Sequence, residues 1–173
     1  MILDANLGWY EILMKIVIPF VATFVIAGLI GLERQNVGKA AGISSHILVA
    51  MGAAGIAILQ RLMYEHEIAL QLSGIAVDPQ GQRIIAQVVT GIGFVGAGVI
   101  IKDQTNVVKG ITTAATIWST AMIGLIFGSG YLILGAILGL FLVVFIAMRD
   151  FSRGFHPFFP HHSRGDVDVE DHH

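Results

Sequence analysis

Three glycines in this sequence, Gly91, Gly93 and Gly96, have a spacing that can bind a phosphate group. The string GIGFVGAGVIIK, residues 91–102, contains Gly-x-Gly-x-x-Gly, which cradles a pyrophosphate in dinucleotide-binding loops. Such a loop follows a strand, opens a helix and has an acidic residue about 20 positions later. No βαβ unit surrounds this string, and the segment ATIWST at residues 115–120 contains no acid. The string therefore predicts no nucleotide site, and its glycines need another explanation.

The remaining candidates are polar side chains within long apolar runs, where strongly polar groups are costly and indicate function. Gln87 and Thr90 lie one helical turn apart and can hydrogen-bond to another helix, either as structural contacts or as ligand contacts. His46 follows two serines and is interpreted as a hydrogen-bonded interface residue in preference to a metal ligand. The hydroxyls of Thr112 and Thr113 can bond to carbonyls of their own helix, so they indicate little alone.

Glu33 and Arg34 close the first apolar run. Because adjacent positions of a helix do not face each other, these two residues are not predicted to form an ion pair with each other. Each is expected to find a partner elsewhere, to contact water, or to extend its charge toward the membrane interface. A later loop offers four possible partners: Lys102, Asp103, Asn106 and Lys109.

Three carboxylates, those of Glu33, Asp78 and Asp103, are candidate Mg²⁺ ligands. Mg²⁺ prefers oxygen ligands, keeps several waters and needs only one or two carboxylates. Asp78 alternatively begins a turn with Pro79. No carboxylate lies in the middle of an apolar run, where an ion pathway is ordinarily marked. The runs also lack paired carboxylates, a Ser–His–Asp set and metal-ligand spacing, so neither an enzyme nor a resident cofactor is predicted.

The elements that position these residues are predicted to be membrane helices. The chain of 173 residues has a mean hydropathy of +0.78 and only 13% charged residues, against about 25% in ordinary soluble domains. A soluble domain of this size cannot bury so much apolar surface. The net charge of −2 gives no indication of nucleic-acid binding. The lack of cysteine excludes disulfides and thiolate chemistry.

Five apolar segments are each near the roughly 20 residues that cross a bilayer. They lie at about residues 12–32, 43–63, 84–101, 111–127 and 131–148. The N-terminus lacks the positive start and cleavage site of a signal peptide, so the first segment is expected to remain as a span. A partly amphipathic link, residues 64–82, is expected at the interface. The sequence thus predicts an all-α bundle of about five transmembrane helices.

Basic residues predict how this bundle is oriented. Seven lie in one set of loops and the C-terminal region: Arg34, Lys39, Lys102, Lys109, Arg149, Arg153 and Arg164. Three lie on the opposite side: Lys15, Arg61 and Arg83. The positive-inside rule then places the N-terminus outside and the C-terminus in the cytoplasm. Residues 1–149 are predicted as the transmembrane domain. Residues 150–173, with five histidines and four acids after residue 155, are predicted as a disordered tail, with loose transition-metal binding as the alternative.

Close helix packing explains the glycines better than phosphate binding does. In a helix, Ala86, Thr90, Gly93 and Ala97 recur at spacings of four, three and four on one face, and such faces let membrane helices pack closely. Similar small-residue spacings occur at residues 27–31, 52–55 and 135–139. The residues of the third segment predicted to pack against other helices are Gly91, Gly93, Gly96, Ala97 and Gly98.

Several long stretches together resemble the MgtC/SapB family of bacterial membrane proteins, over about residues 22–145. They are GLIGLERQ (28–35), AAGISSHILVAMGAA (40–54), RIIAQVVTGIGFVGAGVIIK (83–102) and VVKGITTAATIWSTAMIG (107–124). The resemblance implies an inner-membrane protein of about five spans, linked to growth in low magnesium and, in some members, to survival within host macrophages. It implies a regulator of other membrane proteins, one such action being inhibition of the proton-driven ATP synthase, although the family was first labelled as magnesium transport.

The residues that fall in the family's motifs are Glu33, Arg34, Gln87, Gly91, Gly93, Gly96, Gly98, Asn106, Gly110, Thr112 and Thr113. Two departures from the family pattern matter. First, residues 42–45 read GISS where the family pattern usually reads Gly-Leu-Arg-Thr, so the arginine is missing. The acidic residue that would pair with it, Glu33 or Asp103, is therefore expected to pair with another residue. Many members also have a soluble ACT-like domain after the last span, and this chain is expected to be a short member without it.

Two functions follow from the sequence. The first is a non-enzymatic membrane regulator that packs against a second copy or against other membrane proteins. It is favoured by the lack of carboxylates in the middle of the apolar runs and by the resemblance. The second is a small Mg²⁺ transporter or channel, in which oligomers build a pore from backbone groups and Gln87. The lipid bilayer is a partner in both, and no nucleic acid or nucleotide is expected in either.

Overall fold

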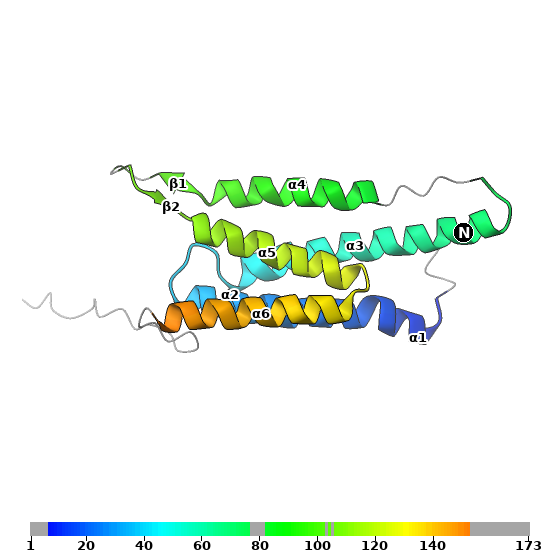
Figure 1. Ribbon diagram of the computed structural model, residues 1–173, viewed down its shortest axis with the longest axis horizontal. Helices are drawn as coiled ribbons and strands as arrows, with labels where there is room; N and C mark the ends of the chain where they lie inside the picture. The colour runs from blue at the N-terminus through cyan, green and yellow to red at the C-terminus, as the bar shows by residue number, and fades with distance from the viewer. Residues whose placement is uncertain (1–6, 77–81, 103, 105, 153–173) are drawn as a thin grey trace, which may run out of the picture.

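A computed structural model of the chain describes residues 7–76, 82–102, 104 and 106–152. The helices lie side by side along one long axis, with a small hairpin at one end (Figure 1). In chain order the elements are α1 (Trp9–Ile12), the π-helix η2 (Leu13–Val17), α2 (Ile18–Asn36), α3 (Ile43–Leu72), α4 (Gln82–Gly98), β1 (Ile101–Lys102), β2 (Val108–Lys109), α5 (Ile111–Gly128) and α6 (Leu132–Phe151). The predicted all-helical bundle is confirmed.

Four stretches of helix are long and apolar enough to cross a membrane: Trp9–Asn36, Ile43–Leu72, Ile111–Gly128 and Leu132–Phe151. The third predicted span, residues 84–101, is shorter than expected. Its helix α4 has 17 residues and is therefore about 25 Å long. The chain leaves the helix after Gly98 because it turns into the strand β1, which pairs with β2 in an antiparallel hairpin. The orientation of the bundle in the membrane stays a prediction.

Other helices run further than predicted. α3 extends nine residues past residue 63, to Leu72, so half of the predicted interfacial link is helical. α6 ends at Phe151, and Asp150 therefore belongs to the last helix and not to the predicted tail. Residues 153–173, with the predicted disorder and metal binding, lie outside the described residues.

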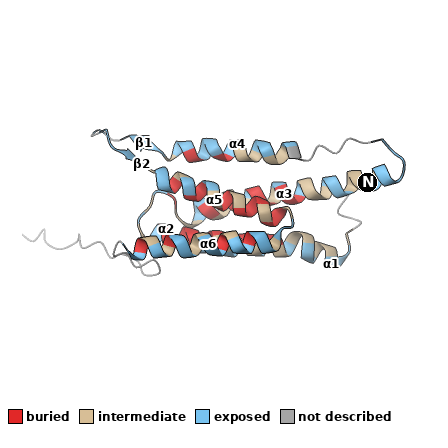
Figure 2. Ribbon diagram, in the orientation of Figure 1, coloured by how far each residue is buried: buried red, intermediate tan, exposed pale blue. Residues whose placement is uncertain are grey.

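α5 is the central helix of the bundle. It contacts α2, α3, α4 and α6, and buried residues concentrate along it (Figure 2). One apolar core lies between α3, α4 and α5, where Ala53 and Ala57 meet Ile92, Ala121 and Leu125. A second lies between α2, α5 and α6 and consists of Ile30, Ile123, Phe127 and Ile146. The two cores hold the same helix from opposite sides.

Glycines let α5 approach α3 at backbone distance. A methyl group added to Gly124 would overlap the carbonyl oxygen of Ala50, and one added to Gly128 would overlap that of Ala54. Both alanines are fully buried. Membrane helices associate through such close contacts because lipid gives no hydrophobic drive between them. Among the small residues of α3, Ala53 and Ala54 lie in this interface, as the sequence predicts.

We expect Gly124→Ala to lower the free energy of unfolding by about 2 kcal/mol, because one added methyl forces two backbones apart. The measurement is reversible unfolding in mixed micelles. Gly52→Ala, in α3, is the control, since a methyl there meets nothing within 4 Å. Equal stability of the two variants would contradict the close approach of α3 and α5.

The small residues of α2 and α6 also pack as predicted. A methyl group on Gly31 would lie 2.6 Å from the Cα atom of Ile43, and one on Gly135 would lie 2.7 Å from the ring of Phe127. A methyl on Gly139 would lie 2.9 Å from the side chain of Ile26. These distances are shorter than van der Waals contact, so the chain's own fold accounts for these glycines.

Candidate functional site

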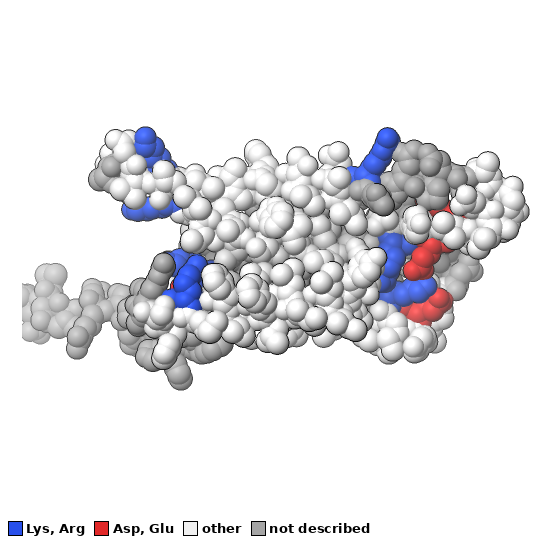
Figure 3. Space-filling model, in the orientation of Figure 1, with Lys and Arg blue, Asp and Glu red and all other residues white. Residues whose placement is uncertain are grey.

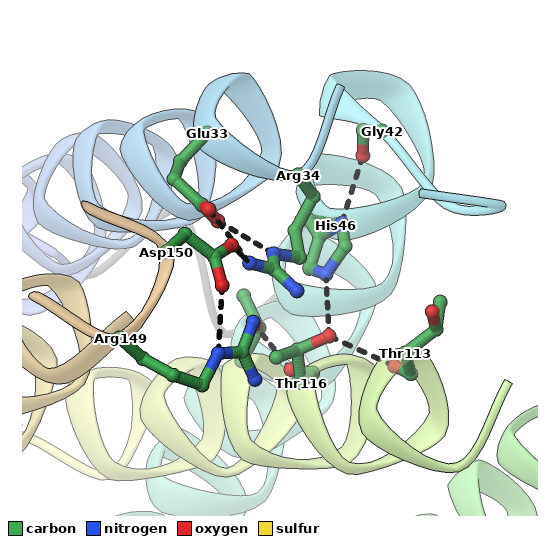
Figure 4. Close-up of polar contacts among 9 residues, drawn as sticks. Glu33, Arg34, Gly42, His46, Thr113, Thr116, Arg149 and Asp150 are labelled. Carbon is green, nitrogen blue, oxygen red and sulfur yellow. Dashed lines mark hydrogen bonds and ion pairs between the residues drawn. The ribbon is translucent and has the colours of Figure 1, made fainter. Parts of the chain in front are cut away.

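Charged side chains gather at the two ends of the bundle and leave an uncharged belt between them (Figure 3). At the end that carries the hairpin, four charged residues meet: Glu33 and Arg34 from the end of α2, and Arg149 and Asp150 from the end of α6 (Figure 4). We call these four residues the charged quartet. The side chain of Arg34 is 0% exposed, and those of Glu33 and Asp150 are 5% and 2% exposed. Arg149 is 19% exposed, so the quartet is an ionic cluster with three buried members that cross-links two helices.

Arg34 is the centre of the quartet. Its Nε donates to Oε2 of Glu33 at 2.5 Å, and its Nη2 donates to Oε1 of Glu33 at 2.6 Å. The same Nη2 also donates to Oδ2 of Asp150. The second oxygen of Asp150, Oδ1, accepts a hydrogen bond from Nε of Arg149 at 2.8 Å. Each carboxylate oxygen thus receives one guanidinium donor.

The quartet contains two carboxylates and two guanidinium groups, so its formal charge is zero. Burying charged groups is strongly unfavourable unless each is paired and hydrogen-bonded. The two positive and two negative groups neutralise one another, but two N–H groups have no acceptor. Nη1 of Arg34 and Nη2 of Arg149 are buried with no hydrogen-bond partner among the described residues.

The prediction that Glu33 and Arg34 do not pair with each other is wrong. Their Cα–Cβ bonds point in different directions, as expected for neighbours in a helix, but the long arginine stem folds back and its planar fork matches the carboxylate. The alternative that each charge extends toward the membrane interface is also wrong, since both side chains are buried. Arg34 takes its second partner from α6, through Asp150, and not from the loop that contains Lys102 and Asn106.

His46 lies beside the quartet, in the first turn of α3, and is fully buried. Its Nδ1 lies 2.8 Å from the carbonyl oxygen of Gly42, and its Nε2 lies 3.3 Å from Oγ1 of Thr116 on α5. Thr116 also contacts the carbonyl oxygen of Thr113 at 2.9 Å. The interpretation of His46 as a hydrogen-bonded interface residue agrees with these contacts.

The structure does not bring the other predicted residues to this site. Gln87 and Thr90 are exposed on α4, and the Thr90 hydroxyl donates to Ala86 of its own helix at 3.1 Å instead of to another helix. Thr112 and Asn106 are exposed at the hairpin end. Asn106 has a φ of 63°, which asparagine tolerates in a turn. Two of the proposed Mg²⁺ ligands, Asp78 and Asp103, lie outside the described residues.

The residues predicted as packing contacts on α4 mostly face outward. Of Gly91, Gly93, Gly96 and Gly98, only Gly96 meets another helix, since a methyl there would contact the side chain of Ala114 at 3.7 Å. A methyl at the other three would meet nothing within 4 Å in the part of the chain that the structure describes, and Ala97 is exposed. Contact with a second copy or another protein therefore stays a prediction for this face.

A second ionic cluster lies at the opposite end of the bundle. Lys15 bonds to Glu11 at 3.1 Å and to Glu65 of α3 at 2.7 Å. Arg61 lies 4.0 Å from Glu65, and its Nη2 donates to the backbone carbonyl of Lys15. That carbonyl is four residues before Pro19, which has no N–H to give it. Arg61 thus supplies a donor that the proline removes from the helix.

Sequence reasoning missed three features of these sites. Asp150 and Arg149 were available as the first charges after the last apolar run, but the predicted boundary assigned Asp150 to the tail. Thr116 and Thr120 were not predicted as site residues, although they share one helix face with Thr113, which was, and all three are buried on α5. The position of Pro19 identifies the carbonyl of Lys15 as short of a donor, but nothing in the sequence identifies Arg61 as the partner.

Within the described part of the chain, no group of three His, Asp or Glu side chains could hold a metal ion. Both oxygens of Glu33 accept hydrogen bonds from Arg34, so a cation at this carboxylate would be repelled by the positive charge of the guanidinium. The arrangement is suited to holding α2, α3, α5 and α6 together at one end.

Comparison with known proteins agrees with the motifs. The sequence profile of the MgtC family matches residues 20–154. The chain is 45% identical over 121 residues to the putative magnesium transporter YhiD of Escherichia coli (strain K12), covering 70% of this chain and 54% of that protein. It is 38% identical over 125 residues to the protein MgtC of Brucella abortus, covering 72% and 47%. The chain spans about half the length of these curated relatives. No solved structure matches it.

Proposed function

Because this chain belongs to the MgtC family, we propose that it is a non-enzymatic regulator in the bacterial inner membrane, linked to adaptation to low magnesium. It acts by packing against the helices of partner membrane proteins. The observation that supports this proposal is the outward face of α4, which carries small residues and a polar amide that the described part of the chain does not cover.

α4 lies at the edge of the bundle and packs through one face only (Figure 2). Ile85, Val88, Val89 and Ile92 turn toward α3 and α5. Gly91 and Gly93 lie on the two flanks of this packed face, and an added methyl at either meets nothing within 4 Å among the described residues. A glycine within a helix costs about 1 kcal/mol relative to alanine. The packing of the described residues gives no reason for that cost, whereas close approach of another helix does.

Gln87 adds a polar group one helical turn from Gly91, on the uncovered surface of α4. Its side chain is exposed and makes no hydrogen bond among the described residues. Its neighbours Val88 and Val89 pack on the core between α3 and α5, so the amide lies alongside an apolar layer. An amide without a partner in hydrocarbon is unfavourable. A partner helix that offers an amide or hydroxyl group would satisfy it.

The proposed regulatory function predicts a specific effect of the substitution Gly93→Leu. We expect this variant to fold normally, because a Cβ at Gly93 has nothing within 4 Å among the described residues, and to lose contact with its partner, because leucine blocks close approach. The measurement is crosslinking in native membranes from a photoreactive residue at Phe94, which is 84% exposed. We expect the crosslinked fraction to fall about tenfold, which corresponds to about 1.4 kcal/mol.

Gly96→Leu is the matched control in the same helix. Gly96 is buried against Ala114, so leucine there is expected to lower the stability of the isolated chain, in contrast to Gly93→Leu. Unchanged crosslinking, abundance and low-magnesium growth in Gly93→Leu would mean that this face of α4 contacts no partner.

The alternative is a small Mg²⁺ transporter or channel, which is favoured by the name of the Escherichia coli relative, a putative magnesium transporter. Its test is Mg²⁺ uptake into sealed proteoliposomes, read with an internal dye, for the wild type and for Asp78→Asn and Asp103→Asn. Saturable uptake that either variant lacks would establish transport. No uptake by folded, inserted protein would favour the regulator. Glu33→Gln is unsuitable as the diagnostic variant because it unbalances the charged quartet.

A further inference from the structure

The protonation of His46 can be deduced from its hydrogen bonds. Nδ1 lies 2.8 Å from the carbonyl oxygen of Gly42. A carbonyl oxygen can only accept, so Nδ1 carries a hydrogen and donates it. This leaves Nε2 as the nitrogen whose protonation can change.

Nε2 faces a hydroxyl group that has two possible partners. Oγ1 of Thr116 lies 3.3 Å from Nε2 and 2.9 Å from the carbonyl oxygen of Thr113 (Figure 4). A hydroxyl has one proton to donate. If the ring is neutral, Thr116 donates to Nε2. If the ring is charged, Nε2 donates to Thr116, and Thr116 donates to Thr113. The contacts from Nδ1 to Gly42, from Nε2 to Thr116 and from Thr116 to Thr113 can all be hydrogen bonds at the same time only when both ring nitrogens carry a proton.

We propose that His46 is a proton-binding site between α3 and α5, and that the Thr116 hydroxyl reverses its hydrogen bond when Nε2 gains or loses its proton. The bond between the two helices persists in both states, and only a hydroxyl rotates. A buried ring that lost its hydrogen bond on protonation would resist the change. This ring has a partner that accepts either state.

Charged groups face His46 from two other helices. From α2 the ring is faced by Glu33 and Arg34, and from α6 by Arg149 and Asp150. α5 has no ionisable side chain, and the nearest charge on α3 is Arg61, at the other end of the bundle. Arg34 lies next to the ring, so a proton on Nε2 places a second positive charge beside the guanidinium, and the carboxylates of Glu33 and Asp150 lie on the far side of Arg34.

The test is nitrogen NMR of the full chain in lipid nanodiscs, with ¹⁵N-labelled histidine. The chain has seven histidines, so the other six are replaced by glutamine to leave one signal pair. Between about pH 9 and 5, we expect Nδ1 to stay protonated while Nε2 changes from a bare to a protonated nitrogen. This is the reverse of the tautomer that free histidine prefers in water.

Two variants test the role of Thr116. Thr116→Ser keeps the hydroxyl, and its neutral Nε2 signal is expected to match the wild type. Thr116→Val keeps the shape but removes the hydroxyl, so the neutral Nε2 signal is expected to move to the position of an unbonded nitrogen. A neutral ring with its proton on Nε2, an Nε2 signal that does not change with pH, or identical spectra for Thr116→Val and wild type would each overturn the proposal.

Discussion

Asp150→Asn is expected to lower the free energy of unfolding by about 3–5 kcal/mol, the range for removing one partner of a buried ion pair. The substitution keeps the shape of the side chain but leaves Arg34 and Arg149 with a single carboxylate, that of Glu33. The cluster then has a net positive charge in a place where Arg34 is 0% exposed. We expect lower abundance in membranes and earlier unfolding in mixed micelles.

The balance of the quartet makes a second variant diagnostic. In the double variant Asp150→Asn with Arg149→Gln, one carboxylate and one guanidinium remain, and the formal charge returns to zero. We expect the double variant to be more stable than Asp150→Asn alone, which is the signature of coupled residues. Arg83→Gln is the control, because Arg83 is exposed and its loss is expected to change stability by no more than about 0.5 kcal/mol. If Asp150→Asn were as mild as Arg83→Gln, the quartet would not stabilise the fold.

These expectations concern residues that the sequence predicted only in part. Membrane helices were predictable because each apolar run has to satisfy its backbone hydrogen bonds internally, and the runs that begin near Ile43 and Ile111 are helices that start at those residues. The short α4 was not predictable from hydropathy. Its end depends on a turn in which Gly110 has a φ of 90° and a methyl on it would overlap the carbonyl of Val99, a contact between residues on either side of the hairpin.

The charged quartet shows that candidate residues can be predicted from one segment of the chain but their partners cannot. Glu33 and Arg34 were identified as candidates because of their cost at the end of a span. Their partner could not be deduced, since Arg34 and Asp150 are 116 positions apart and only the packing of α6 against α2 brings them together. His46 was identified in the same way, but its bond to Thr116 depends on the approach of α5 to α3. Spacing identifies the costly residues, and tertiary packing selects their partners.

The same distinction applies to Arg61, for which we expect the second large effect. Arg61→Met is expected to lower the free energy of unfolding by about 3 kcal/mol, because the Lys15 carbonyl loses its charged donor, the Arg61 side chain, which is only 15% exposed at this end of the bundle. Pro19 cannot replace that donor, because it has no N–H, and the wide turn of the π-helix Leu13–Val17 comes directly before it. The measurement is unfolding in mixed micelles.

Pro19→Ala separates this explanation from a general need for charge at position 61. Alanine restores the N–H that a regular helix would direct at the Lys15 carbonyl, so the cost of Arg61→Met is expected to be smaller in the Pro19→Ala background than in the wild type. A double-mutant cycle measures this coupling. The ion pair between Lys15 and Glu65 is present in all four proteins of the cycle and therefore cancels. Equal costs of Arg61→Met in the two backgrounds would mean that Arg61 stabilises the bundle through Glu65 or packing, and not by completing the helix that the proline interrupts.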